Sequence, residues 1–197
     1  MNLRIKKLDI IIGIDPDVEK NGVALLNCKN KKLEITTLSF PDLLDYLRCA
    51  KRQAEVSGLN LLVVVEAGWM NKGNWHLKPK DTKASAAAKG NNAGRNQETG
   101  RKIVEMCRHW QINVDEVKPL VKLWKGTDRK ITHEELAYFT GITGRTNQEG
   151  RDAALLAWVY AGFSIKNRHK AQRKAKFYIN KCRSASCMQG GWKRTSA

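Results

Sequence analysis

A chain of 197 residues with 42% apolar side chains is long enough to bury the core of one domain. Its 36 Lys and Arg against 19 Asp and Glu give a formal net charge of +17, which favours a polyanionic partner. A run of about 18 apolar residues that could span a bilayer is missing, as is a secretory signal. We therefore expect a cytoplasmic protein with no membrane partner.

The positive charge is concentrated at the C-terminal end. Residues 165–197 hold ten Lys and Arg and no Asp or Glu, so this segment carries +10 of the total charge of +17. The segment is also poor in large aliphatic side chains and cannot bury much surface. We expect one folded domain over residues 1–164 and a basic, flexible tail over residues 165–197.

The N-terminal part predicts three strands in series. Residues 8–15 form an almost continuous β-branched run, which is typical of a strand buried on both faces, and Pro16 ends it. Residues 23–28 and 33–39 follow as two further strands, separated by short polar turns. Strands joined by such turns form an antiparallel meander.

The middle of the chain predicts a helix, a strand and a loop. A helix opens at Pro41 with apolar residues at helical spacing and closes near Gly58. Residues 61–65 then read as a second buried strand, which ends at Glu66. Residues 68–90 have no clear period, so we predict a long mobile loop there.

The remainder predicts three helices and one strand. Residues 97–110 have helical spacing, and residues 112–117 form a short strand. A Thr-x-x-Glu capping box at Thr132 begins a helix that Gly141 ends. The last helix is expected over residues 147–163, which are rich in Ala, Leu and Trp.

Four carboxylates stand out by their positions. Asp15 and Glu66 each end an apolar strand, although ionised acids avoid apolar surroundings unless a cation compensates them. If the two strands are neighbours, both carboxylates emerge at the sheet edge where open α/β sheets bind ligands. Glu149 and Asp152 lie three residues apart at a helix start, so they share one face and could complete the cluster.

A cluster of four acids repels itself unless divalent cations neutralise it, and oxygen ligands suit Mg²⁺ or Mn²⁺. Two such ions about 3.5–4 Å apart are suited to in-line attack on a phosphodiester. Each acid also has a structural interpretation. Asp15 can begin a turn, Glu66 can be a solvated strand end, and Glu149 and Asp152 can complement the helix dipole.

Three motifs in order resemble those of the RuvC family of Holliday-junction resolvases. Gly13-Ile14-Asp15-Pro16 is similar to the family's opening Gly-Ile-Asp-Pro-Gly signature. Val65-Glu66 followed by Trp69 resembles its second motif, a Glu at a strand end with an aromatic residue three positions on. The run from Glu149 through Asp152 to Ala154 resembles its third, an Asp-x-x-Asp-Ala sequence that opens the final helix.

The resemblance covers residues 8–163 and implies an α/β protein with the RNase H-like fold. Its five-stranded mixed sheet would combine an antiparallel three-stranded meander with two parallel strands, flanked by helices. The implied activity is that of a Mg²⁺-dependent endodeoxyribonuclease, a homodimer that resolves four-way DNA junctions by paired nicks. The implied catalytic set consists of Asp15, Glu66, Glu149 and Asp152, which would hold two Mg²⁺ ions, or Mn²⁺ as a substitute.

Two residues depart from the family's motifs. Asp17 replaces the Gly expected after Asp-Pro, and Glu149 stands where Asp is usual. The longer Glu149 side chain can still reach a metal, although the geometry and the metal preference change. Asp17 is either a turn residue or a supplementary ligand.

Aromatic and basic residues in the predicted loop are candidates for DNA binding. Trp69 resembles the family's aromatic residue near the junction centre and could stack on bases, or it could simply pack within the protein. Lys72 and Trp75 belong to a run of alternating cations and aromatics that suits either a phosphate-binding arm or a solvated linker.

Further basic residues follow the fifth predicted strand or lie within the third motif. Lys122, Lys125 and Lys130 follow the fifth strand, where proteins similar to RuvC also place cations on the DNA side. Lys122 or Lys125 is the best candidate for contact with the scissile phosphate. Arg151 lies between two proposed ligands and could offset their charge or contact DNA.

Three other functions remain open from the sequence. Another RNase H-type nuclease, transposase-like or RNA-processing, would share the carboxylates without the preference for junctions. A basic DNA-binding protein would not use them for catalysis. An ATPase of the actin and sugar-kinase type would need about twice this length.

Overall fold

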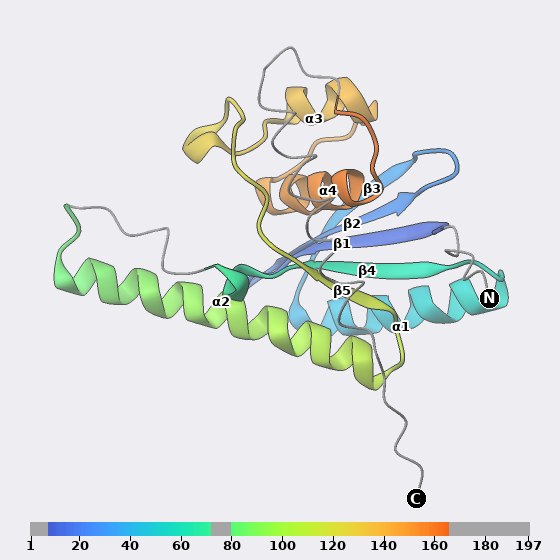
Figure 1. The fold of residues 1–197 in the computed structure, drawn as a ribbon, viewed down its shortest axis with the longest axis horizontal. Coiled ribbons are helices and arrows are strands. Elements are labelled where there is room, and N and C mark those ends of the chain that lie inside the picture. Colours follow the sequence, from blue (N-terminus) through green and yellow to red (C-terminus); the bar gives the residue numbers. More distant parts are fainter. Residues whose placement is uncertain (1–7, 72–79, 166–197) are drawn as a thin grey trace, which may run out of the picture.

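The computed structural model describes residues 8–71 and 80–165 and contains a mixed sheet of five strands in the order β3-β2-β1-β4-β5 (Figure 1). Three strands form an antiparallel meander, and the other two run parallel to the first. The strands are β1 (Ile10–Asp15), β2 (Asn21–Asn27), β3 (Leu33–Leu38), β4 (Leu61–Glu66) and β5 (Val114–Val117). The expected α/β arrangement, a five-stranded mixed sheet that combines an antiparallel meander with two parallel strands, is therefore confirmed.

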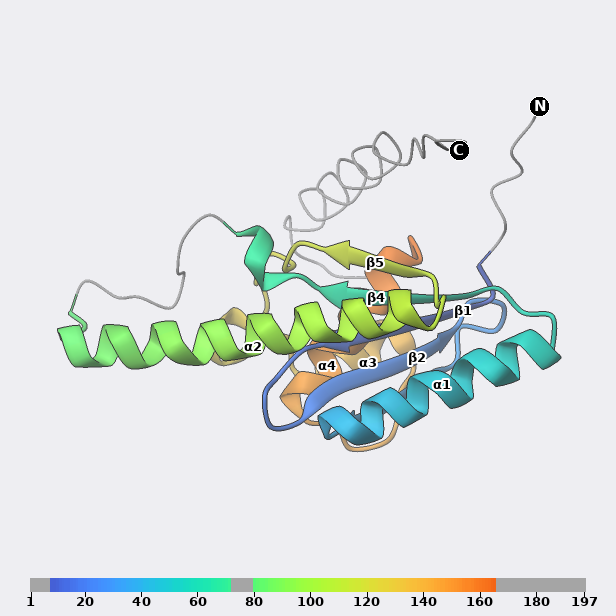
Figure 2. The same cartoon turned by 90° about the horizontal axis from the view of Figure 1, so that it is seen from below.

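Helices cover both faces of this sheet (Figures 1 and 2). On one face α1 (Phe40–Val56) and the second half of α2 (Lys83–His109) bury apolar side chains against β1 and β4. On the other face lies α4 (Gln148–Tyr160), and α3 (His133–Thr140) packs outside it. Two short 3-10 helices, η1 (Gly68–Met70) and η2 (Thr127–Arg129), interrupt the connections.

Local sequence signals set the ends of α3 and α4. Thr132 and Glu135 form the predicted reciprocal capping box at the start of α3. Gly141 ends that helix with a φ of 75°, in the left-handed region that favours glycine. The Asn147 side chain accepts a hydrogen bond from the backbone of Gly150 and so caps α4, which ends at Tyr160 rather than at residue 163.

The prediction of a loop over residues 68–90 is wrong at both ends. Residues 68–70 form η1, and α2 begins at Lys83 instead of residue 97 (Figure 2). Thr82 caps α2, but its buried residues start only at Gly100. The first half projects past the sheet, and its Ala-rich sequence has no apolar face to produce a helical period. Residues 72–79 lie outside the described ones.

The described residues cover most of the first of the two predicted parts of the chain. The described residues up to Ile165 belong to the sheet, its helices and their connections, and residues 166–197 are not among the described ones. The basic tail therefore stays a prediction. Within the described part of the chain, no helix is long and apolar enough to cross a membrane.

Candidate metal centre

The two strand-end acids come from neighbouring parallel strands. Ile14 of β1 is paired with Val65 of β4 in parallel register. Because Asp15 and Glu66 directly follow these partners, they stand side by side at the carboxyl ends of the two strands. This is the edge at which open α/β sheets bind their ligands.

Two glycines allow α4 to approach this edge closely. A Cβ atom at Gly13 would lie 2.4 Å from the carbonyl oxygen of Ala153. At Gly22, which pairs with Asp15, it would lie only 2.1 Å from the carbonyl oxygen of Glu149. Only hydrogen atoms at these positions let the N-terminal half of α4 rest on β1 and β2. The close packing thereby brings the third sequence motif to the sheet edge.

The charges of three carboxylates act on one another. Burial raises the pKa of Asp15 well above its usual value, and the negative charges of Glu66 and Asp152 raise it further. Burial also raises the pKa of Glu66 to about 7, with Asp152 adding to the shift and Lys122 and Lys130 opposing it. Asp15, Glu66 and Asp152 therefore form one electrostatic cluster.

Asp152 is held by two neighbours. Its Oδ1 accepts a 2.8 Å hydrogen bond from the side-chain amide of Gln148, and its Oδ2 lies 3.1 Å from the ammonium of Lys130. Within the described residues, no three His, Cys, Asp or Glu side chains are arranged to hold a metal ion together.

Glu149 takes a different place from the other three acids. Its backbone lies against Gly22, and its charge acts on Lys130 together with those of Asp152 and Asp15. Burial alone would lower the pKa of Lys130, but these acids raise it overall. Glu149 is thus at the edge of the cluster, on the side of Lys130.

A cavity of about 20 Å³ lies beside the cluster. Such a volume is sufficient for roughly one water molecule. Its polar walls are the acids Glu66 and Asp152 and the cations Lys122 and Lys130, and its apolar walls are Leu120, Val121, Trp124, Ile131 and Leu155. Lys122 is exposed here, which leaves its ammonium accessible from solvent.

Trp69, predicted to stack on bases or to pack, is in contact with protein groups. Its indole nitrogen donates a 3.1 Å hydrogen bond to Glu116, and Arg101 lies 5.5 Å from the ring centroid. A Cβ at Gly100 would be 2.5 Å from the ring, so the indole packs closely on α2. These contacts give Trp69 a packing role, while stacking on DNA stays a prediction.

Arg151 points its guanidinium at backbone and amide oxygens. It donates to the carbonyl oxygens of Ile131 (3.0 Å) and Thr146 (2.7 Å) and to the side-chain oxygen of Gln148 (2.8 Å). The side chain therefore joins the loop before α3 to the start of α4. Contact between Arg151 and DNA stays a prediction, as does that of the exposed Lys125. Lys72 and Trp75 lie outside the described residues.

Asp17 serves the turn between β1 and β2. Its Oδ1 accepts a 2.9 Å hydrogen bond from the backbone of Glu19, as in the turn interpretation, and its Oδ2 accepts one from the Asn96 side chain. Asn96 is a residue that the sequence did not single out, because its partner is 79 positions away. Gln148 was also missed, although its spacing of four from Asp152 on a helix is a recognisable signal.

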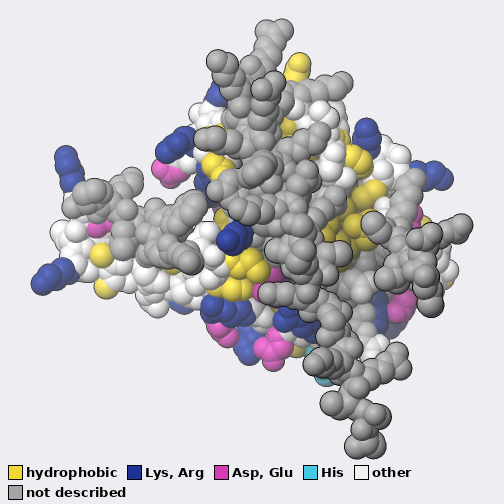
Figure 3. Space-filling view, viewed as in Figure 1, with side chains coloured by type: hydrophobic (Ala, Val, Ile, Leu, Met, Phe, Trp, Pro, Cys, Tyr) yellow, Lys and Arg dark blue, Asp and Glu magenta, His cyan; other side chains and the backbone are white. Residues whose placement is uncertain are grey.

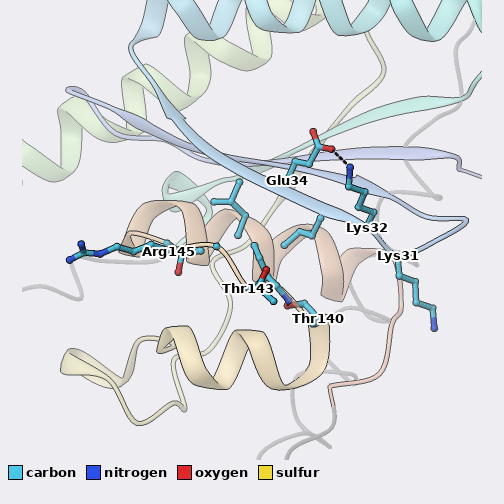
Figure 4. Close-up of a pocket in the computed structure, with 12 residues that line it drawn as sticks. Lys31, Lys32, Glu34, Thr140, Thr143 and Arg145 are labelled. Carbon is cyan, nitrogen blue, oxygen red and sulfur yellow. Dashed lines mark hydrogen bonds and ion pairs between the residues drawn. The ribbon is translucent and has the colours of Figure 1, made fainter.

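A larger groove lies elsewhere, between β3 and the segment that joins α3 to α4 (Figure 4). Its volume is about 470 Å³, and its lining includes Lys31, Thr143 and Arg145. Glu34 is the acid in its lining, and it forms a 2.9 Å ion pair with Lys32. None of the four predicted ligands lines this groove, so its chemistry is not that of a carboxylate metal site.

Basic side chains are distributed over several elements on the face shown in Figure 3, including the projecting end of α2, and some alternate with acids along its lower edge. The chain thus has no single cationic patch on the visible described surface. The two cations that act on the carboxylate cluster, Lys122 and Lys130, both lie on the segment between β5 and α3.

Comparisons with known proteins give a distant structural likeness. No family model matches the chain, and no curated protein matches its sequence. Among solved structures, the chain is similar to T. thermophilus RuvC in complex with a Holliday junction substrate, with a TM-score of 0.48 and 13% identity. The match covers 77% of this chain and 92% of that one. Such an identity is too low to transfer residue roles, which follow here from the geometry of this chain.

Proposed function

We propose that this chain is a metal-dependent endonuclease that hydrolyses phosphodiester bonds in branched DNA, with four-way junctions as its substrate. The observation that supports this most directly is the cluster at the ends of β1 and β4. There burial raises the pKa of Asp15 and the charges of Glu66 and Asp152 raise it further, while the cations Lys122 and Lys130 lie alongside. Repelling acids beside cations suit a site for both metal ions and phosphate.

The donor set fits a hard divalent cation. Every candidate ligand is a carboxylate, and oxygen ligands are those that Mg²⁺ and Mn²⁺ prefer. Asp15, Glu66 and Asp152 would hold the ions, with Glu149 reaching in from the first turn of α4. Two bound ions would supply an activated water and would stabilise the leaving 3′ oxygen.

The protein groups have separate tasks in this proposal. Asp15 and Glu66 provide negative charge that is costly to keep in the metal-free state, since burial opposes it. The exposed ammonium of Lys122 acts on Glu66 and is accessible from outside, so it is placed to contact a phosphate near the cluster. The net charge of +17 would draw DNA toward the molecule.

The junction preference and the homodimer belong to the proposal as well. A four-way junction offers two equivalent strands, and a two-fold protein would present one cluster to each of them. Paired nicks at symmetric positions are the expected product.

The experiment compares three substrates incubated with the full chain and Mg²⁺ and resolved on denaturing gels. A four-way junction, a linear duplex and an RNA/DNA hybrid separate the candidate activities. We expect symmetric nicks in the junction, which are lost in Asp15→Asn and retained in Asp45→Asn, an exposed acid of α1. Preferential cleavage of the hybrid would point instead to another RNase H-type nuclease. Binding without metal-dependent cleavage would leave a DNA-binding protein.

A further inference from the structure

Lys130 forms the closest contact between a cation and the carboxylate cluster. Its ammonium lies 3.1 Å from Oδ2 of Asp152, and the two side chains are only 30% and 14% exposed. Most surface ion pairs contribute little because water screens them and their side chains are mobile. This pair is largely withdrawn from water, so its charges interact more strongly.

The backbone around Lys130 is fixed on both sides. Its amide donates a 3.1 Å hydrogen bond to the carbonyl oxygen of Thr127, and its own carbonyl oxygen accepts one from Gly126 at 3.0 Å. The next residue, Ile131, accepts the hydrogen bond from Arg151 of α4. The lysine is therefore directed at Asp152 from a loop that is itself tied to α4.

The surrounding acids favour the charged form of Lys130. Burial opposes the ammonium, yet the charges of Asp152, Asp15 and Glu149 raise its pKa. Lys122 also acts on Asp15 and Glu66, but its side chain is exposed. Lys130 is consequently the cation that compensates the acids from inside the protein.

We propose that Lys130 is an internal counter-ion that holds Asp152 in the metal-free protein and must release it when a divalent cation binds. If Mg²⁺ binds about 2.1 Å from the carboxylate that holds the ammonium, the two cations repel each other at short range, which favours release of Lys130. Metal binding and release of Lys130 are thus one exchange. This inference rests on the proposed function, because it requires the cluster to bind a divalent ion.

The exchange has two consequences. It keeps the metal-free fold stable, since Asp152 is never left as an unpaired charge beside Asp15. It also lowers the metal affinity below that of a bare carboxylate cluster, because each binding event has to break the ion pair. Removing the lysine should reverse both effects.

The test measures Mn²⁺ affinity by electron paramagnetic resonance and thermal unfolding in chelator and in saturating Mg²⁺. We expect Lys130→Met to bind Mn²⁺ about tenfold more tightly than wild type, equivalent to about 1.4 kcal/mol. It should also unfold at a lower temperature in chelator, and Mg²⁺ should remove the difference. Lys125→Met is the matched control, since it removes an equal charge from an exposed lysine of the same segment that does not line the cavity beside the cluster. Its affinity should rise by less than about threefold.

The outcomes separate the two proposals. A wild-type chain that binds no Mn²⁺ overturns the proposed function itself. Wild-type binding combined with unchanged affinity in Lys130→Met, or with an equal rise in Lys125→Met, overturns the counter-ion role alone. If Lys130→Met does not fold in chelator, the double variant with Asp152→Asn removes both charges and should fold. If the double variant also fails to fold in chelator, loss of the ion pair does not explain the unfolding of Lys130→Met, and the counter-ion role is overturned.

Discussion

The side-chain amide of Asn96 donates a 2.9 Å hydrogen bond to Oδ2 of Asp17, across 79 positions of sequence. The Asn96 side-chain oxygen in turn accepts a 3.1 Å hydrogen bond from the backbone of Val18. A single residue of α2 thus binds the turn that follows Asp15 through two hydrogen bonds. The position of the first carboxylate depends on a helix that belongs to another part of the chain.

Replacing Asn96 by alanine should loosen this turn. Two hydrogen bonds are lost, one of them to a charged acceptor, so we expect the free energy of unfolding to fall by about 1–3 kcal/mol. The Mn²⁺ affinity should also weaken because Asp15 is held less firmly. Urea unfolding and Mn²⁺ titration measure the two effects. Asn92→Ala, at an exposed position on the same helix, is the control, and it should leave the Mn²⁺ affinity unchanged and raise stability slightly through helix propensity.

The sequence was informative where a local pattern determines the structure. Asp15 and Glu66 could be predicted at one sheet edge because each follows an apolar strand, and the capping box at Thr132 depends on residues only three apart. The hydrogen bond from Asn96 to Asp17 could not be predicted, since no sequence pattern near Asn96 specifies Asp17 as its partner. The same limit applied to the first half of α2, where helix formation rests on alanine and a Thr82 cap instead of a buried face.

The ion pair of Lys130 illustrates a further limit. The sequence placed this lysine among the candidate DNA contacts, because a cation after the fifth strand has no visible partner in one dimension. Its partner, Asp152, becomes apparent only when α4 lies on the glycines of β1 and β2. This close packing is possible because glycine has no side chain. A sequence motif built on charged side chains does not indicate it.

Glu66 should make stability depend on pH in the metal-free protein. Its carboxyl has a pKa of about 7 in the folded chain, against an ordinary value of 4.5. The folded state therefore binds more protons between these values, so the free energy of unfolding should fall as the pH rises from about 4.5 to about 7. Asp15 acts in the same direction because its pKa is also raised.

Glu66→Gln should remove much of this dependence. At pH 8 in chelator, where wild-type Glu66 is ionised, we expect the variant to be more stable by roughly 1–3 kcal/mol. Below pH 4 the two proteins should differ little, since both side chains are then neutral. Urea unfolding across this pH range provides the measurement. If the free energy of unfolding changes between pH 5 and 7 by the same amount in wild type and in Glu66→Gln, the raised pKa of Glu66 is contradicted.

Gly22→Ala should push α4 away from the sheet. The added Cβ would lie 2.1 Å from the backbone oxygen of Glu149, and a backbone atom cannot move aside as a flexible side chain can. We expect a loss of about 1–3 kcal/mol in stability, together with weaker Mn²⁺ binding as the third motif shifts.

Gly94→Ala is the matched control for this substitution. Gly94 lies inside α2 and has nothing within 4 Å of an added Cβ. Alanine there should stabilise the helix by about 0.5–1 kcal/mol. Equal effects of the two substitutions in chemical unfolding would show that α4 does not depend on close contact at Gly22.

Arg151 offers a test between a structural role and DNA contact. Its guanidinium binds Ile131, Thr146 and Gln148, and Gln148 in turn donates to Asp152. Arg151→Lys keeps the charge but cannot reproduce this fork, so stability and Mn²⁺ affinity should fall while the salt dependence of DNA binding stays unchanged.

Lys125→Met removes an exposed cation. If Lys125 contacts a phosphate, the negative slope of log affinity against log salt should become shallower by about one. A comparable change of slope in Arg151→Met would identify the arginine as a phosphate contact and contradict the structural role.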